Sequence, residues 1–82
     1  MSRKRTIKML QDLECCIDER EALEKAEIAI RESIHKSYMY EASDDLLDPL
    51  EMAIVAVRAR LAHIRTVESK IHRKLEMAGQ YV

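Results

Sequence analysis

Three side chains in the last third of the sequence have a spacing that could bind a metal ion. Glu68, His72 and Glu76 follow one another at intervals of four residues, so they would share one face of a helix. Carboxylate and imidazole groups can bind a transition metal when a second subunit supplies further ligands. The same spacing is typical of a row of surface ion pairs, and we favour that interpretation. We therefore expect no metal, no cofactor and no catalytic residue.

A second set of side chains has the charge needed to bind a polyanion. Its members are basic and fall in an N-terminal group and a later strip: Arg3, Lys4, Arg5, Lys8, Arg58, Arg65, His72 and Arg73. Such groups contact phosphates without reading bases. Arg58, Arg65 and His72 recur at heptad spacing, which would also let several subunits pool an enzyme site. The net charge of −1 argues against nucleic-acid binding, and nothing in the spacing distinguishes an enzyme site from a solvated face.

The charges are distributed unevenly along the chain. Residues 21–51 contain nine acidic and three basic residues, whereas residues 52–82 contain six basic and two acidic residues. We interpret this distribution as complementary helix surfaces that form ion pairs within one subunit or between subunits. A basic face that binds a polyanion is the alternative.

The cysteines and the apolar runs indicate the compartment. Cys15 and Cys16 are neighbours in the sequence, and adjacent cysteines rarely bond to each other because the bridge strains the backbone. On a helix they point about 100° apart, so we expect one in the core and the other partly exposed. No apolar run approaches the roughly 20 residues that span a bilayer, and no secretory signal follows the basic start. We expect a cytoplasmic protein without membrane contact.

The composition predicts that helices position all of these groups. The sequence has one glycine, one proline and neither phenylalanine nor tryptophan, and helix formers dominate it. Strands and tight turns would need more glycine and proline. We predict a single all-α domain over residues 1–82, because a chain of this length supports one small core.

Two helical arms joined by one loop account for the pattern. We predict a helical arm over residues 2–40, a loop over 41–48 and a helix over 49–78, which together form an antiparallel helical hairpin. The apolar stripe of the first arm shifts by about 100° near Arg20, and either a kink there or one continuous helix would accommodate this shift.

Local residue types support the limits of the second helix. Asp48 suits an N-cap, Pro49 suits the first helical position, and Glu51 lies where a capping-box acid belongs. Gly79 is placed to end the helix.

Two seams of the second half indicate how many neighbours its helix needs. An apolar heptad seam, interrupted by Glu68, consists of Leu50, Ile54, Val57, Leu61, Ile64, Ile71 and Leu75. Small residues that let helix axes approach closely form a second seam, consisting of Val55, Ala59 and Ala62, and the first arm carries a matching seam, consisting of Ala22, Ala26 and Ala29. A helix with two apolar faces needs two neighbours, whereas a hairpin supplies one. Glu68 either fixes the register or marks where the seam opens to solvent.

The missing neighbour has two sources. A second copy would give a four-helix bundle with two-fold symmetry, whereas residues 2–17 folded back would give a monomeric three-helix bundle. We favour the homodimer, because the signals for a break near Arg20 are weak and a short chain gains stability by sharing a core. The resulting hypothesis is a non-enzymatic regulator, adaptor or inhibitor that binds another protein. A basic-face nucleic-acid or nucleotide binder is the alternative, and an enzyme with a site pooled between subunits is less favoured.

Overall fold

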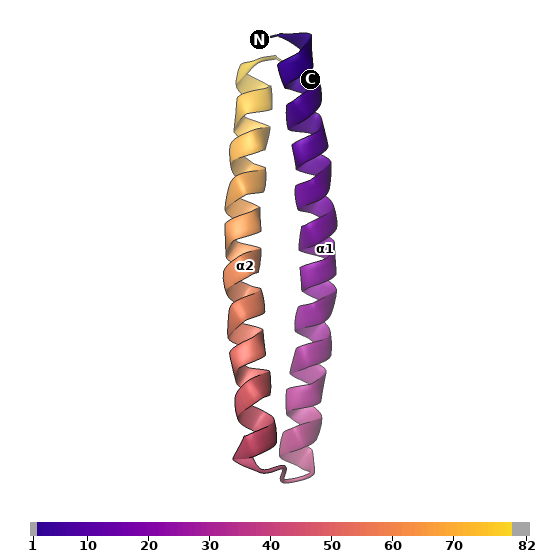
Figure 1. Ribbon diagram of the computed structural model, residues 1–82, viewed down its shortest axis with the longest axis vertical. Helices are drawn as coiled ribbons and strands as arrows, with labels where there is room; N and C mark the ends of the chain where they lie inside the picture. Colours follow the sequence, from indigo (N-terminus) through magenta and orange to yellow (C-terminus); the bar gives the residue numbers. More distant parts are fainter. Residues whose placement is uncertain (1, 80–82) are drawn as a thin grey trace.

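The protein is an antiparallel hairpin of two long α-helices. The computed structural model describes residues 2–79, with α1 at Arg3–Met39 and α2 at Asp44–Met77. The helices run side by side along the long axis, with the connecting turn at one end (Figure 1). The Cα atoms extend over 57 × 17 × 16 Å. This arrangement confirms the all-α hairpin.

α1 is one continuous helix, so the kink near Arg20 and the three-helix bundle that needs a break there are both wrong. Its 37 residues correspond to about 55 Å at 1.5 Å per residue, close to the 57 Å length of the molecule. The residues that face α2 recur at alternating intervals of three and four, and each is buried or half-buried: Leu13, Cys16, Arg20, Leu23, Glu27, Ile30 and Ile34. The apparent shift of the stripe arises because Arg20 and Glu27 occupy inward positions.

α2 begins within the predicted loop, so the expected loop 41–48 and the helix start at residue 49 are wrong. Ser43 is the N-cap, and Pro49 lies inside the helix rather than at its first position. The turn is short, and Glu41 adopts a left-handed conformation with φ of 53°. The backbone N–H of Ala42 donates to the carbonyl of Ser37 at 2.8 Å, which closes the turn against the end of α1.

Side-chain burial and charge explain the earlier start of α2. The first turn carries Asp44 and Asp45, whose carboxylates the helix dipole favours. It also brings Leu47 into the core, where this side chain is 7% exposed. Pro49 removes one hydrogen bond to the carbonyl of Asp45, which lies on the exposed end of the helix. At the other end, Gly79 has φ of 72° and stops α2 as its residue type predicts.

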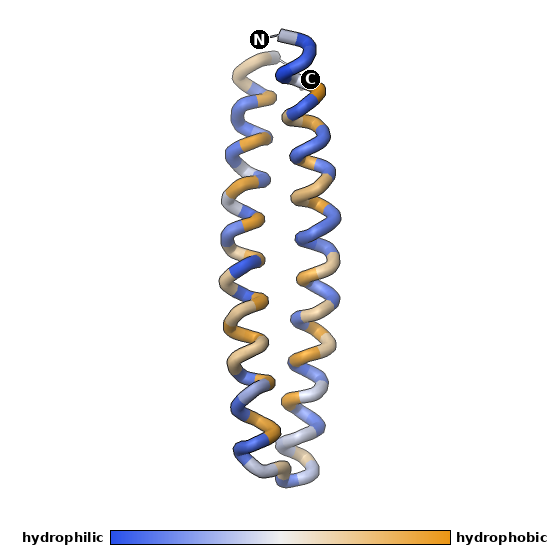
Figure 2. Tube along the Cα trace, viewed as in Figure 1, coloured by the Kyte–Doolittle hydropathy of each residue, from blue (hydrophilic) through white to orange (hydrophobic). Residues whose placement is uncertain are grey.

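The core is a thin seam between the two helices. The buried side chains are Leu13, Cys16, Leu47, Ile54, Leu61, Ile64 and Leu75, and Leu50, Val57 and Ile71 of the predicted seam are half-buried. Figure 2 shows apolar segments recurring along both helices, with hydrophilic segments at the start of α1. No helix within residues 2–79 combines the length and apolarity needed to cross a membrane.

The two cysteines divide between core and surface, as the helical geometry predicts. Cys16 is 8% exposed, and Cys15 beside it is exposed. Burial raises the pKa of the Cys16 thiol. Cys16 therefore acts as a small apolar filler of the seam.

Candidate functional site

A cluster of charged side chains joins the two helices near their middle. Arg20 of α1 donates its Nε to Glu68 Oε2 at 2.9 Å and its Nη1 to Glu24 Oε1 at 3.2 Å. Arg65 of α2 reaches the same Glu24 oxygen at 3.5 Å, and His72 Nε2 lies 3.9 Å from Glu68 Oε1. The hydrogen bonds to Glu24 and Glu68 raise the pKa of Arg20 above its ordinary value. We call these five residues the Arg20 cluster.

Glu68 is held by a cation from the facing helix. Its side chain is only 16% exposed, and that of Arg20 is 27% exposed. Sliding one helix past the other would leave this half-buried carboxylate without its hydrogen bond, which is more costly than the bond is favourable. The contact favours the interpretation that Glu68 fixes the register of the two helices.

We expect Glu68→Ala and Arg20→Ala each to lower the free energy of unfolding by about 1–2 kcal/mol, because each removes the hydrogen bond between these two half-buried charges. The double variant should lose less than the sum of the two, since this hydrogen bond can be lost only once. Urea unfolding followed by circular dichroism at one protein concentration measures the free energy of unfolding of wild type, the two single variants and the double variant. Lys8→Ala, which removes an exposed pair with Asp12, is the control and should cost below about 0.5 kcal/mol. Strictly additive losses would contradict a coupled pair.

Arg58 and Arg65, two members of the predicted basic strip, form ion pairs with carboxylates of α1. Arg58 Nε lies 3.1 Å from Glu27 Oε2, and Arg65 belongs to the Arg20 cluster. Arg60, which the sequence analysis did not select, donates to both carboxylate oxygens of Glu19 at 2.7 and 3.2 Å. These hydrogen bonds lower the pKa of Glu19. The complementary surfaces predicted from the charge distribution therefore form ion pairs within one chain.

A second group of basic residues gathers at the end of the hairpin opposite the turn. This basic end consists of exposed side chains from both helices: Arg3, Lys4, Arg5, Lys8, Lys70, Arg73 and Lys74. The first turn of α1 contains no acidic residue, although the helix dipole favours negative charge there. Helix stability therefore does not explain the basic first turn. His72 is half-buried in the Arg20 cluster and lies apart from this surface.

The face of α2 that points away from α1 carries an exposed apolar strip along its middle, with the exposed His63 at one edge of the strip. Ala59 lies two positions from the buried Leu61, so the two side chains point about 200° apart. Met52 and Val55 are 73% and 66% exposed on the same side. We define the outer face of α2 as Met52, Val55, Ala56, Ala59 and Ala62, all of which are exposed.

Apart from Ala26, the predicted small-residue seam is exposed and lies outside the hairpin interface. Val55, Ala59 and Ala62 belong to the outer face of α2. On α1, Ala22 and Ala29 are exposed and Ala26 is half-buried. The hairpin alone therefore leaves these small residues without the close helix neighbour that their spacing predicts.

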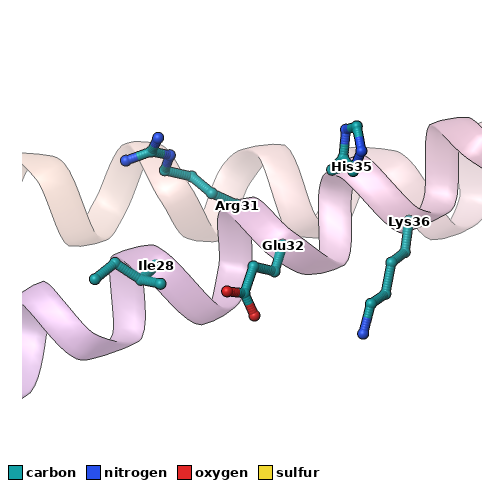
Figure 3. Close-up of a pocket in the computed structure, with 5 residues that line it drawn as sticks. All are labelled: Ile28, Arg31, Glu32, His35 and Lys36. Atoms are coloured by element: carbon teal, nitrogen blue, oxygen red, sulfur yellow. The ribbon is translucent and has the colours of Figure 1, made fainter.

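One depression on α1 contains a spacing that the sequence analysis overlooked. Glu32 and His35 form a Glu-x-x-His pair, which occurs in helices that bind two iron ions. Ile28, Arg31 and Lys36 line the same depression. In Figure 3, Glu32 and His35 project to different sides of the helix and do not converge. Across residues 2–79, no three His, Cys, Asp or Glu side chains come together as a metal site, including the row at Glu68.

A tyrosine hydrogen bond joins the end of α1 at the turn to α2. The Tyr38 hydroxyl donates to Glu51 Oε1 at 2.8 Å, and this bond raises the pKa of Tyr38. The next two side chains, Met39 and Tyr40, are 67% and 82% exposed. They present a sulfur and an aromatic ring to solvent beside the acidic start of α2.

Comparison of the chain with protein-family models, with curated proteins and with solved structures gave no match. The functional proposal therefore depends on the exposure, charge and packing of the described residues.

Proposed function

We propose that the chain is a small non-enzymatic helical protein that forms a homodimer and acts by binding another protein. The observation that carries this proposal is the outer face of α2, where Met52 and Val55 are largely exposed in the middle of a long helix. A contiguous apolar strip of this kind marks an interaction surface. A second copy would supply the second neighbour that a helix with two apolar faces needs.

The thin core supports assembly as well. Among residues 2–79 the hairpin buries seven hydrophobic side chains and leaves ten large ones exposed. A domain this small buries a modest share of its surface, and sharing a core with a second subunit adds to its stability.

The turn end of the hairpin suits a protein partner. Exposed Met39 and Tyr40 can serve as adaptable apolar anchors, and the exposed acids Glu41, Asp44 and Asp45 follow them in the turn and at the start of α2. A basic partner surface with an apolar pocket would complement this end. The setting we propose is cytoplasmic, because the chain contains two free thiols, Cys15 and Cys16.

Sedimentation equilibrium of the intact protein tests the homodimer. We expect a mass of two chains at tens of micromolar and a melting temperature that rises with protein concentration, because dissociation precedes or accompanies unfolding. A strict monomer over that concentration range would overturn the proposal.

The basic end is the observation that favours a second candidate, a polyanion binder. Arg3, Lys4 and Arg5 lie together in the first turn of α1, where the helix dipole opposes their charge. Arg58 and Arg65 are engaged with carboxylates, so they give little support to a polyanion strip or to a pooled enzyme site along the middle of the hairpin.

Under this second candidate, we expect the protein to bind single-stranded nucleic acid at low salt through the basic end. Replacing Arg3, Lys4 and Arg5 together by Ala should weaken binding and flatten the dependence of log affinity on log salt by about 2, since about 0.7 is lost per phosphate contact. Fluorescence anisotropy across a salt series measures both effects. Arg58→Ala is the control and should leave the salt slope unchanged. Absence of binding at low salt would end this hypothesis.

A further inference from the structure

The outer face of α2 continues into opposite charges at its two ends. Toward the turn it reaches Asp45 and Asp48, and toward the other end it reaches Lys70 and Arg73, all of them exposed. These charges fall on the same side of the helix as the apolar strip, because every step along the series is three or four residues. The full series is Asp45, Asp48, Met52, Val55, Ala59, Ala62, Thr66, Lys70 and Arg73.

The charges are arranged symmetrically about Ala59. Asp48 precedes Ala59 by eleven residues and Lys70 follows it by eleven, while Asp45 and Arg73 each lie fourteen residues away. At 1.5 Å per residue these positions lie about 16 and 21 Å from Ala59 in either direction. A two-fold axis at Ala59 would therefore place each aspartate opposite a cation of a second copy. A parallel pair of α2 helices would instead place like charges together.

The centre of the face permits the close contact that this symmetry requires. Ala56, Ala59 and Ala62 surround the axis, and their small side chains allow helix axes to approach to about 8 Å. Met52 and Val55 lie between Asp48 and Ala59 along the helix. In the dimer they would pack at the edges of the contact that the alanines form. The apolar strip would supply most of the buried area, and the charged pairs at its rim would select the orientation.

We propose that the outer face of α2 binds the same face of a second copy in antiparallel orientation, with a two-fold axis at Ala59. Asp48 then pairs with Lys70 of the second copy, and Asp45 pairs with Arg73 of the second copy, on both sides of the axis. This inference rests on the proposed homodimer and specifies its interface and orientation.

Charge reversal tests the orientation. Asp48→Lys and Lys70→Glu should each raise the dimer dissociation constant about tenfold, because each places like charges together at two symmetric positions. The two substitutions combined in one chain should restore wild-type affinity, and an equimolar mixture of the single variants should form the heterodimer in preference to either homodimer. Asp48 and Lys70 lie about 33 Å apart along α2, so no contact within one chain can cause this rescue.

A matched control separates pairing from net charge. Glu32→Lys makes the same change of charge as Asp48→Lys, but on the exposed surface of α1, and it should leave the dissociation constant unchanged. Sedimentation velocity measures all variants. If wild type is dimeric but the combined variant is no tighter than the single ones, the antiparallel pairing is overturned and the homodimer stands. A monomeric wild type overturns both.

Cysteine cross-linking tests the register independently. In a background of Cys15→Ser and Cys16→Ala, the Ala59→Cys variant should form an intermolecular disulfide on mild oxidation, because its two copies meet at the axis. Met52→Cys should not cross-link to itself but should cross-link when mixed with Thr66→Cys. Rapid self-cross-linking of Met52→Cys in place of Ala59→Cys would overturn the proposed axis.

Discussion

Leu61→Asp is expected to leave the protein largely unfolded in dilute buffer at room temperature. Leu61 is 1% exposed and lies in the middle of α2, facing α1. The substitution removes a buried aliphatic side chain and places a carboxylate in the seam without a cation for it, at a combined cost of at least about 4 kcal/mol. A chain of this length has a free energy of unfolding of about 4–12 kcal/mol, and a hairpin with so thin a core belongs at the lower end of this range, where the loss equals the whole stability.

Far-ultraviolet circular dichroism and urea unfolding measure this result. Gln11→Asp is the matched control, because it adds the same charge at an exposed position of α1 and should change the free energy of unfolding by at most about 0.5 kcal/mol. If Leu61→Asp keeps the helicity and the cooperative melting of wild type, this result contradicts the structure, in which the seam faces α1.

The inward face of α2 was predictable because its signal is periodic. Apolar side chains at alternating intervals of three and four identify one helix face irrespective of what packs against it. Leu61, Ile64 and Leu75 are accordingly buried. The same rule describes α1 only when Arg20 and Glu27 are counted as inward-facing, and hydropathy alone assigns such residues to the surface. The ion pairs that make these positions acceptable depend on the register between the helices.

The start of α2 was misplaced because the local signal competes with a tertiary one. Asp48 and Pro49 have suitable residue types for a helix start. Burial of Leu47 against α1 and the favourable charges of Asp44 and Asp45 outweigh the hydrogen bond that Pro49 removes. The charge term is local to α2, whereas the burial of Leu47 exists only once the two helices are paired, so a reading of consecutive residues does not detect it.

The individual ion-pair partners could not be read from the sequence either. The uneven charge distribution predicts that an acidic segment faces a basic one. It does not indicate that Glu24 lies between Arg20 and Arg65, or that Arg60 binds Glu19. Arg60 was overlooked because it lies outside the heptad row that contains Arg65. Assigning partners across an antiparallel pair requires the register, which only the folded hairpin provides.

Ala59→Arg is expected to separate the two copies and to leave the hairpin intact. Ala59 is exposed on the outer face of α2, so an arginine there meets no side chain of its own hairpin core. In the proposed dimer, the two copies of the substituted residue would meet at the axis, where bulky side chains replace a close contact and like charges face each other. Such a juxtaposition costs several kcal/mol, which corresponds to a dissociation constant raised at least about a hundredfold.

Sedimentation and thermal melting together distinguish this result from unfolding. The mass should fall to one chain while the circular dichroism spectrum stays helical, and the melting temperature should no longer depend on protein concentration. Ala22→Arg is the matched control, because it makes the same substitution at an exposed alanine of α1 and should leave the dimer mass unchanged. If Ala22→Arg dissociates the protein and Ala59→Arg does not, the interface lies on the small residues of α1. Substitutions at Leu61 and Ala59, two positions apart on one helix, should therefore cause unfolding and dissociation respectively.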